Sequence, residues 1–288
     1  MATKKKSTKA KTKKAPVKKP AKAIAVSKTK TSSKNKFSTL KKWNILLAVV
    51  LVGQAIAIVV LGKSVSLPVN TQYLTNDALA SQAAGHTVLV PAVRHMFDVN
   101  VRYLVGAFLA VAAIIYGLAA SVWRQKYEAQ LAKRINIFRW INFTISGGLM
   151  FVLVAMLNGV YEAASLLMIV VLFGLLQFLG YFGEAKAGDR KAKNQTFIAL
   201  CVAGLTVWLA IAMYLKGAIF YGVGLSHYVY WIDGGLFVIA LCLAANKFQV
   251  FKASGRWADY IYGERIFMIL SLIAKSGLAW LVFAGLLK

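Results

Sequence analysis

The sequence predicts an all-α membrane protein, folded as a bundle of seven transmembrane helices. Of its 288 residues, 59% are hydrophobic, and the mean hydropathy of +0.63 is well above that of a soluble domain. Apolar runs of about 20 residues recur, and each can cross a hydrocarbon core roughly 30 Å thick. The alternating ten-residue strands typical of a membrane β-barrel are absent from the pattern.

Charged or turn-rich breaks separate seven spans. They fall at about 43–62, 99–122, 138–158, 161–182, 196–215, 227–246 and 265–287.

The first connection, 63–98, is long for a helical bundle. It contains Pro68, Pro91 and a β-prone run, Thr87-Val88-Leu89-Val90. Because structureless loops of this length are uncommon, we expect a small β-hairpin here, extracellular in the topology below. Exposed strand edges can pair, so this connection is a candidate contact for a homodimer.

Residues 1–42 differ from the membrane domain, 43–288. They hold 16 lysines and no acidic residue. Such a segment buries too little apolar surface to offset its ordering entropy, so we predict a disordered tail that contacts anionic lipid head groups. It lacks the apolar core and cleavage site of a signal peptide. It also carries no aromatic or structured reader, so nucleic-acid binding is not expected.

Basic residues favour a cytoplasmic N-terminus in a cell membrane. The connections on the side of the tail are rich in Lys and Arg, and those on the other side are poor in them. Seven spans then place the C-terminus outside. The basic residues counted for the inner side are Arg124, Lys126, Lys133, Arg134, Lys186, Arg190, Lys191, Lys193, Lys247, Lys252 and Arg256.

One lysine, Lys275, lies inside the last apolar stretch. The flanking run, about Ile266 to Leu287, has no other charged residue. A charge at bilayer depth costs roughly 2.5–3.5 kcal/mol on insertion scales, so this lysine indicates a function. Ser271, four residues earlier, shares its helix face and can bond either the lysine nitrogen or its own helix backbone.

A polar stripe opens the third span. Arg139, Asn142, Phe143 and Ser146 stand at i, i+3, i+4 and i+7, so they should face the bundle interior. Ser146 can also be explained by close helix packing alone. Asn142 cannot, because a buried amide needs a polar partner.

Other polar residues have simpler interpretations. Asp233 is expected near the outer end of the sixth span, and Glu264 at the inner interface of the seventh. Glu162 suits a helix N-terminus. Cys201 and Cys242 are isolated in apolar surroundings and predict neither a disulfide framework nor a metal site.

Seven helices with a lysine in the last one resemble the retinal-binding rhodopsins. More specifically, Asp259-Tyr260-Ile261-Tyr262-Gly263-Glu264-Arg265, followed by Leu270 to Ser276, is similar to the seventh helix of heliorhodopsins. Arg139-Trp140 and Ser146 in the third span resemble that family too, as do the inverted topology and the long first connection. The resemblance covers about residues 40–288.

The resemblance implies that Lys275 carries all-trans retinal as a Schiff base, with Ser271 beside it. Light would isomerise the polyene and drive a slow, sensory conformational change, read by a cytoplasmic signalling partner. It implies a homodimer and no enzymatic activity. The alternatives are a light-driven or light-gated ion transporter, and a membrane protein without chromophore in which Lys275 pairs with Asp233.

One departure from the family pattern matters. The pattern Arg-Trp-x-Glu supplies a Schiff-base counterion, but the Glu position here is Asn142. Positions where many relatives carry histidine are Leu51 and Tyr116. Since a neutral amide cannot balance a cation, three arrangements are open. A bound anion such as chloride can be held with help from Arg139 or Ser146, the Schiff base can be neutral, or Asp233 can be recruited.

Overall fold

The computed structural model describes residues 21–186 and 188–288. The chain divides into two units, Met1–Ser38 and Thr39–Lys288, and each is described by itself. In the first unit the described residues are helical and belong to α1 (Ala21–Leu61). This helix begins inside the stretch for which we expected disorder, where alanine and lysine are both good helix formers. The expectation for residues 1–20 lies outside the described residues.

The prediction of seven spans is confirmed. Counted over the described residues, seven helical stretches are long and apolar enough to cross a membrane. Four of them, the first, fifth, sixth and seventh, run several residues beyond the expected limits into more polar sequence. The fifth, for example, begins at Arg190 because the Asp189 side chain caps it, accepting from the backbone N–H groups of Lys191 and Ala192. The stretches are Phe37–Leu61, Val101–Ala120, Ile137–Leu157, Ala163–Ala185, Arg190–Tyr221, His227–Lys252 and Tyr260–Leu287.

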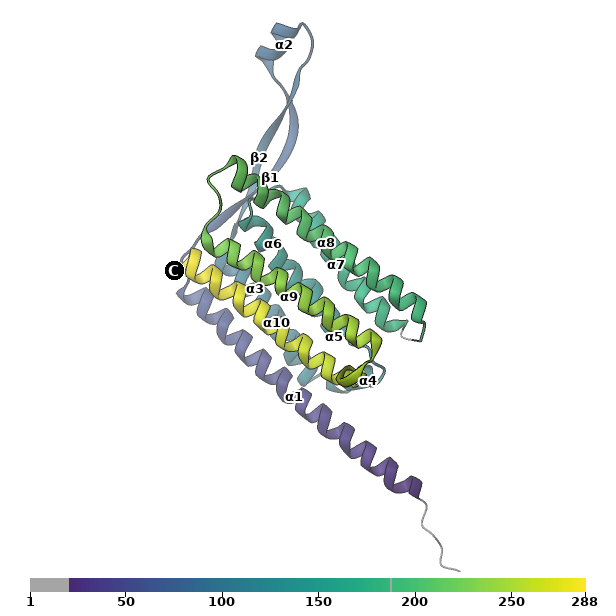
Figure 1. The fold of residues 1–288 in the computed structure, drawn as a ribbon. Helices are drawn as coiled ribbons and strands as arrows, with labels where there is room; N and C mark the ends of the chain where they lie inside the picture. Colours follow the sequence, from purple (N-terminus) through teal and green to yellow (C-terminus); the bar gives the residue numbers. More distant parts are fainter. Residues whose placement is uncertain (1–20, 187) are drawn as a thin grey trace, which may run out of the picture. The chain divides into compact units, whose positions relative to one another are not determined.

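The second unit also contains shorter elements between and within these spans (Figure 1). The third span is divided by a wide π-helical turn, η1, and such turns are frequent at functional sites. The elements are α3 (Val101–Ala120), α4 (Arg124–Ala132), α5 (Ile137–Asn142), η1 (Phe143–Gly147), α6 (Gly148–Leu157), α7 (Ala163–Ala185), α8 (Arg190–Tyr221), α9 (His227–Lys252), η2 (Gly255–Ala258), α10 (Tyr260–Val282) and η3 (Phe283–Leu287).

The long first connection forms a two-stranded antiparallel sheet. Its strands, β1 (Ser66–Asn76) and β2 (Leu89–Asn100), are joined through a short helix, α2 (Ala78–Ala84). The strands are much longer than the β-prone run suggested, and they extend away from the helices (Figure 1). Near its base, the Asn70 N–H donates to the Tyr161 carbonyl at 2.8 Å, which ties β1 to the α6–α7 connection.

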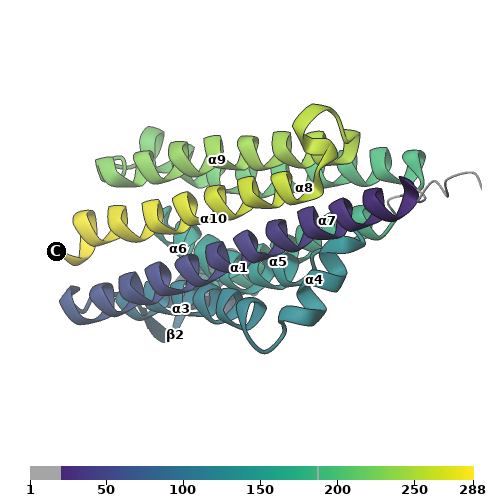
Figure 2. The same cartoon turned by 90° about the horizontal axis from the view of Figure 1, so that it is seen from below.

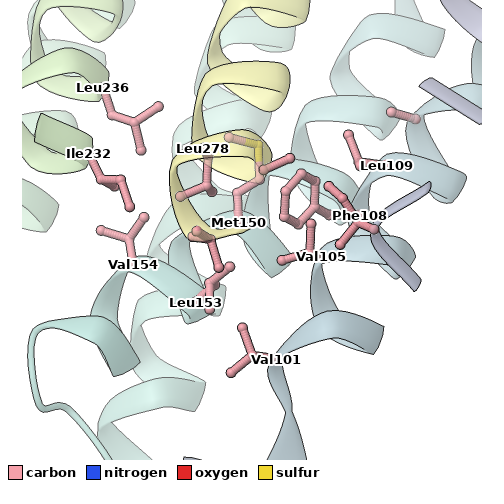
Figure 3. Packing of buried hydrophobic residues seen from close by; sticks show 14 of the residues in the cluster. Val101, Val105, Phe108, Leu109, Met150, Leu153, Val154, Ile232, Leu236 and Leu278 are labelled. Carbon is pink, nitrogen blue, oxygen red and sulfur yellow. The ribbon is translucent and has the colours of Figure 1, made fainter. Parts of the chain in front are cut away.

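An apolar core fills the part of the bundle that lies toward this sheet. Phe108 of α3, Leu153 of α6, Ile232 of α9 and Leu278 of α10 meet there, all at most 1% exposed (Figure 3). Within the second unit, α10 lies between α1 and α9 (Figure 2), and the Ser276 hydroxyl donates to Gln54 of α1 at 3.0 Å. The last helix, which carries Lys275, is therefore central.

Candidate functional site

Lys275 lies in the interior of the bundle. It is 1% exposed, and its Nζ donates to the Ser271 Oγ at 2.8 Å. Of the two roles open to Ser271, the structure therefore shows the hydroxyl accepting from the lysine one helical turn away. The amine has a polar partner although it is shielded from solvent.

The turn η1 supplies the next side chains around this amine. The Phe143 ring centroid is 5.1 Å from Lys275 Nζ, within cation–π range. Ser146 is fully buried, but its hydroxyl donates to the Phe108 carbonyl at 2.8 Å and joins η1 to α3. The side-chain hydroxyl of Ser146 has one proton, and this proton is already used in the bond to Phe108.

A cavity of about 320 Å³ opens beside Lys275 and Ser271. Its volume lies in the range of small-molecule pockets, and its walls are mainly aromatic and aliphatic side chains. These walls, contributed by η1, α6, α7, α8, α9 and α10, include Phe143, Met150, Phe151, Phe173, Trp208, Leu236, Phe237 and Ala274. Arg139 and Lys247 also line it, but both are paired with carboxylates, whereas the Lys275 amine is not. A mainly apolar chamber with this amine at its wall fits a long apolar molecule that carries a carbonyl group at one end.

Arg139 lines the same cavity as Lys275, but its charge is paired with other groups. Arg139 is 7% exposed, and its guanidinium pairs with Glu184 of α7 and Glu264 of α10. Lys247 of α9 donates to the same Glu184 at 2.6 Å. We call these four residues the ionic cluster; two cations and two carboxylates balance within it.

Neutral donors complete the ionic cluster. The Asn136 amide donates to Glu264 at 2.7 Å, and the Trp140 indole donates to Glu184 at 2.9 Å. The Tyr260 hydroxyl adds a longer bond to Glu184 at 3.2 Å. Buried charges are tolerated when they are paired and hydrogen-bonded in this way.

The structure does not bring Asp233 to Lys275. Asp233 is 7% exposed, and it accepts from the Asn158 amide at 3.1 Å. Across the described ranges, no ion pair joins Lys275 to a carboxylate. Asn142 is 2% exposed, and its Oδ1 has no hydrogen-bond partner among the residues that the structure describes.

The comparison with known families decides which protein family the chain belongs to. The family model described as Heliorhodopsin matches residues 40–287. The chain belongs to the heliorhodopsin family.

Solved structures agree with this heliorhodopsin at the level of the fold. The transmembrane domain of Salpingoeca rosetta rhodopsin phosphodiesterase superimposes with a TM-score of 0.60 at 13% identity, over 90% of this chain and 88% of that one. The light-driven proton pump LR (Mac) from Leptosphaeria maculans gives 0.57 at 12% identity, over 86% and 95%. No curated protein matches the chain.

Membership of this family implies a retinal chromophore and a multi-pass membrane protein. The cavity beside Lys275 fits this chromophore, because a primary amine stands at the wall of an aromatic chamber. Leu51 and Tyr116 stand at the positions where histidine is expected in many relatives. In this heliorhodopsin Leu51 is a fully buried core residue, and the Tyr116 phenol lies next to Ser271.

Sequence reasoning missed part of the site. Glu264, expected at an interface, is 1% exposed, and Lys247, counted as a loop charge, is 2% exposed. Glu184 was not singled out. A signal was available, since Arg139, Glu184, Lys247 and Glu264 all stand near span ends on one side of the bundle, with two charges of each sign. Such a balanced set is what a buried cluster requires.

Proposed function

We propose that this heliorhodopsin is a light sensor that binds all-trans retinal covalently at Lys275 through a Schiff base. The observation that supports this most directly is the buried Lys275 amine at the wall of the 320 Å³ aromatic cavity. When bound, retinal supplies a polyene that absorbs light and isomerises. No catalytic step on a substrate is part of the proposal.

The chain's own residues would orient and shield the chromophore. Ser271 holds the Lys275 nitrogen toward the cavity at 2.8 Å, and Phe143 covers it from η1. The rings of Trp208 and Phe237 pack edge to face, at 5.3 Å between centroids, and form part of the cavity wall. Burial of the nitrogen excludes the water that would hydrolyse the linkage.

The charge at Lys275 needs a balance that Asn142 cannot supply. We propose that an anion such as chloride provides it, accepting from the side-chain N–H group of Asn142. Of the helpers expected from the sequence, Arg139 is engaged in the ionic cluster and Ser146 donates to Phe108. This leaves the amide of Asn142 as the polar group that accompanies the anion.

The absorption spectrum across pH, with and without chloride, tests this charge balance. We expect a visible band at neutral pH that requires halide and gives way to near-ultraviolet absorption in sulfate buffer. A visible band in sulfate alone that ignores added halide would exclude the anion. If that band disappears on substitution of Asp233 by Asn, the acid is recruited instead.

The attachment itself is tested by adding retinal to the purified protein. Unchanged protein should become coloured, and borohydride reduction should leave retinal on the peptide that contains Lys275. Lys275→Ala should stay colourless, while Lys252→Ala, at an exposed lysine of α9, should behave as the parent. Equal colour in both variants contradicts the proposal.

We also propose that the N-terminus lies inside the cell and the C-terminus outside. The protein would form a homodimer. Its basic tail would contact anionic lipid, and a cytoplasmic partner would receive the signal. Exposed apolar side chains on the sheet, including Leu74, Val93 and Phe97, support the dimer. Charged substitutions at these three positions should convert a dimer into a monomer in detergent.

Photocurrents in voltage-clamped cells would favour ion transport over sensing.

A further inference from the structure

Two hydroxyl groups continue inward from the Lys275 amine. The first is Ser271, whose oxygen accepts from Lys275 Nζ at 2.8 Å. The second is Tyr116 of α3, whose phenol interacts with the Ser271 side chain. A hydroxyl group is able to accept one hydrogen bond while donating another, so two neighbouring hydroxyls can pass a proton along.

A small second cavity begins at Tyr116. Its volume is about 20 Å³, enough for one water molecule, which needs roughly 10–15 Å³ on the same measure. Tyr116 and Glu264 both line it, together with Asn44 and Asn136. One water molecule there can therefore contact the phenol and the carboxylate together.

Asn44 offers a further polar group to this cavity. Its side chain is 1% exposed and lies near the Tyr127 phenol, but its Nδ2 makes no hydrogen bond of normal geometry among the described residues. A buried amide donor left unpaired costs free energy, whereas a water molecule in the cavity satisfies it. The site also offers the two to four polar partners that a buried water requires.

Glu264 is able to accept a proton at the end of this route. One carboxylate oxygen pairs with Arg139, and the other accepts from Asn136 at 2.7 Å. A carboxylate has about four acceptor positions, so a position remains for the water. The charged groups closest to it are Arg139 directly and Glu184 on the far side of that guanidinium.

We propose that a proton relay joins the Lys275 nitrogen to the Glu264 carboxylate. Its members are Ser271, Tyr116 and one buried water. The proton leaves the nitrogen, each oxygen along the route hands on one proton as it receives another, and Glu264 becomes a neutral acid. The relay rests on the proposed function, because light at Lys275 starts the transfer.

The transfer has a consequence for the helices. With Glu264 neutral, Arg139 and Lys247 share Glu184 as their remaining carboxylate, and the ionic cluster carries a net positive charge. An unbalanced buried charge is disfavoured. The relay therefore couples the chromophore to the ends of α5, α7, α9 and α10, which carry the cluster.

The first test compares two deletions of a phenolic hydroxyl, Tyr116→Phe and Tyr230→Phe. Tyr230 of α9 accepts from the Leu225 N–H and lines neither cavity, so it is the control. After a flash, near-ultraviolet absorption should rise at least about tenfold more slowly in Tyr116→Phe, equivalent to about 1.4 kcal/mol, and at the parent rate in Tyr230→Phe. An unchanged rate in Tyr116→Phe overturns the relay.

Infrared difference spectra identify the acceptor. A protonated-carboxyl band should grow with the near-ultraviolet absorption and be missing in Glu264→Gln. A band that persists in this variant assigns the proton to another acid and overturns the proposal.

A third readout needs no chromophore. A high-resolution structure of the retinal-free protein should show one water between Tyr116, Asn44 and Glu264, and a dry cavity overturns the relay. Failure to form any pigment removes both proposals, whereas a pigment with unchanged kinetics removes the relay alone.

Discussion

Ser271 is the hydrogen-bond partner of the Lys275 amine in the part of the chain that the structure describes. The amine is otherwise surrounded by apolar and aromatic groups, with Phe143 closest among the rings. In such surroundings a single hydrogen bond to a charged group contributes more than it would in water. The Ser271 hydroxyl should therefore influence the electronic state of anything attached to Lys275.

Removal of that hydroxyl gives the first prediction. Ser271→Ala should still bind retinal, but with a shifted absorption maximum, because the nitrogen loses its polar neighbour. Ser276→Ala is the control, since this neighbouring serine of α10 bonds Gln54 instead. Absorption spectra of both variants decide, and an unshifted Ser271→Ala spectrum would contradict this role.

Lys247 gives a second prediction at this scale. Lys247→Met should leave Glu184 short of one cation, and breaking a buried pair typically costs about 3–5 kcal/mol. The melting temperature should fall clearly, whereas exposed Lys252→Met, on the same helix, should change it little. Adding Glu184→Gln to Lys247→Met should restore part of the loss. A melting temperature equal to that of the parent would show that the pair is not stabilising.

The residues found from sequence differ from those missed in a physical way. Lys275 and Ser271 stand out because a charge and a hydroxyl share one face inside an apolar run. Lys247 and Glu264 lie near the ends of spans, where a charge is equally compatible with the interface. Only the packing of four helices shows that these two charges are buried, and that information is absent from the local sequence.

At the scale of elements, α7 and α5 approach closely at Gly180. A Cβ atom added there would overlap the Trp140 indole, which also donates to Glu184 one turn further along α7. Glycine at this position thus lets the aromatic ring lie flat against the helix and reach the ionic cluster.

Substitution of this glycine is the third prediction. Gly180→Ala should displace Trp140 and destabilise the protein by about 1–3 kcal/mol, the usual effect of overpacking. At Gly174, also in α7, an added Cβ meets its nearest neighbour at an ordinary 3.8 Å, so Gly174→Ala serves as the control. Thermal unfolding of both variants, monitored by circular dichroism, should separate them. Equal melting temperatures would show that the contact can relax.

The start of α7 gives a pH-dependent prediction. Hydrogen bonds from the backbone N–H groups of Ser165 and Ala164 lower the pKa of Glu162 from its ordinary value of 4.5. Because the pKa is lowered in the folded state, the ionised carboxylate adds stability above pH 4.5, and that stability disappears as the pH falls through the lowered value. Glu162→Gln should therefore reduce the melting temperature at pH 7 and have no effect at strongly acidic pH. A difference that is independent of pH would contradict the cap.

Helices were easier to predict than their internal details. Seven apolar runs identify seven spans because bilayer thickness sets a minimum length. The wide turn η1 and the extent of β1 and β2 were not predictable in this way. Both depend on contacts distant in sequence, such as the bond from Ser146 to Phe108 and the pairing of Ser66 with Asn100.

For the whole molecule, the distribution of basic residues predicts which end faces the cytoplasm. The ends that carry α4 and η2 are rich in Lys and Arg, while the opposite end carries the sheet and α2. A basic inner side follows the usual bias of multi-pass membrane proteins.

Cysteine labelling in intact cells tests this orientation. After replacement of Cys201 and Cys242, Ala83→Cys on α2 should react with a membrane-impermeant thiol reagent. Lys133→Cys, at an exposed position beside α4, should react only after the cells are opened. The reverse pattern would invert the assignment and move the sheet to the cytoplasm.

The turn η1 has a consequence for how insertions and deletions act on this protein. Each residue rotates an α-helix by about 100°, and a π-helical turn accommodates one residue more than an α-helical turn. Arg139 lies before η1 and Leu153 after it, and both are buried. Loss of one residue, such as Ile145, would rotate one half of the span relative to the other. Here the number of residues, independent of their chemistry, sets which side chains meet.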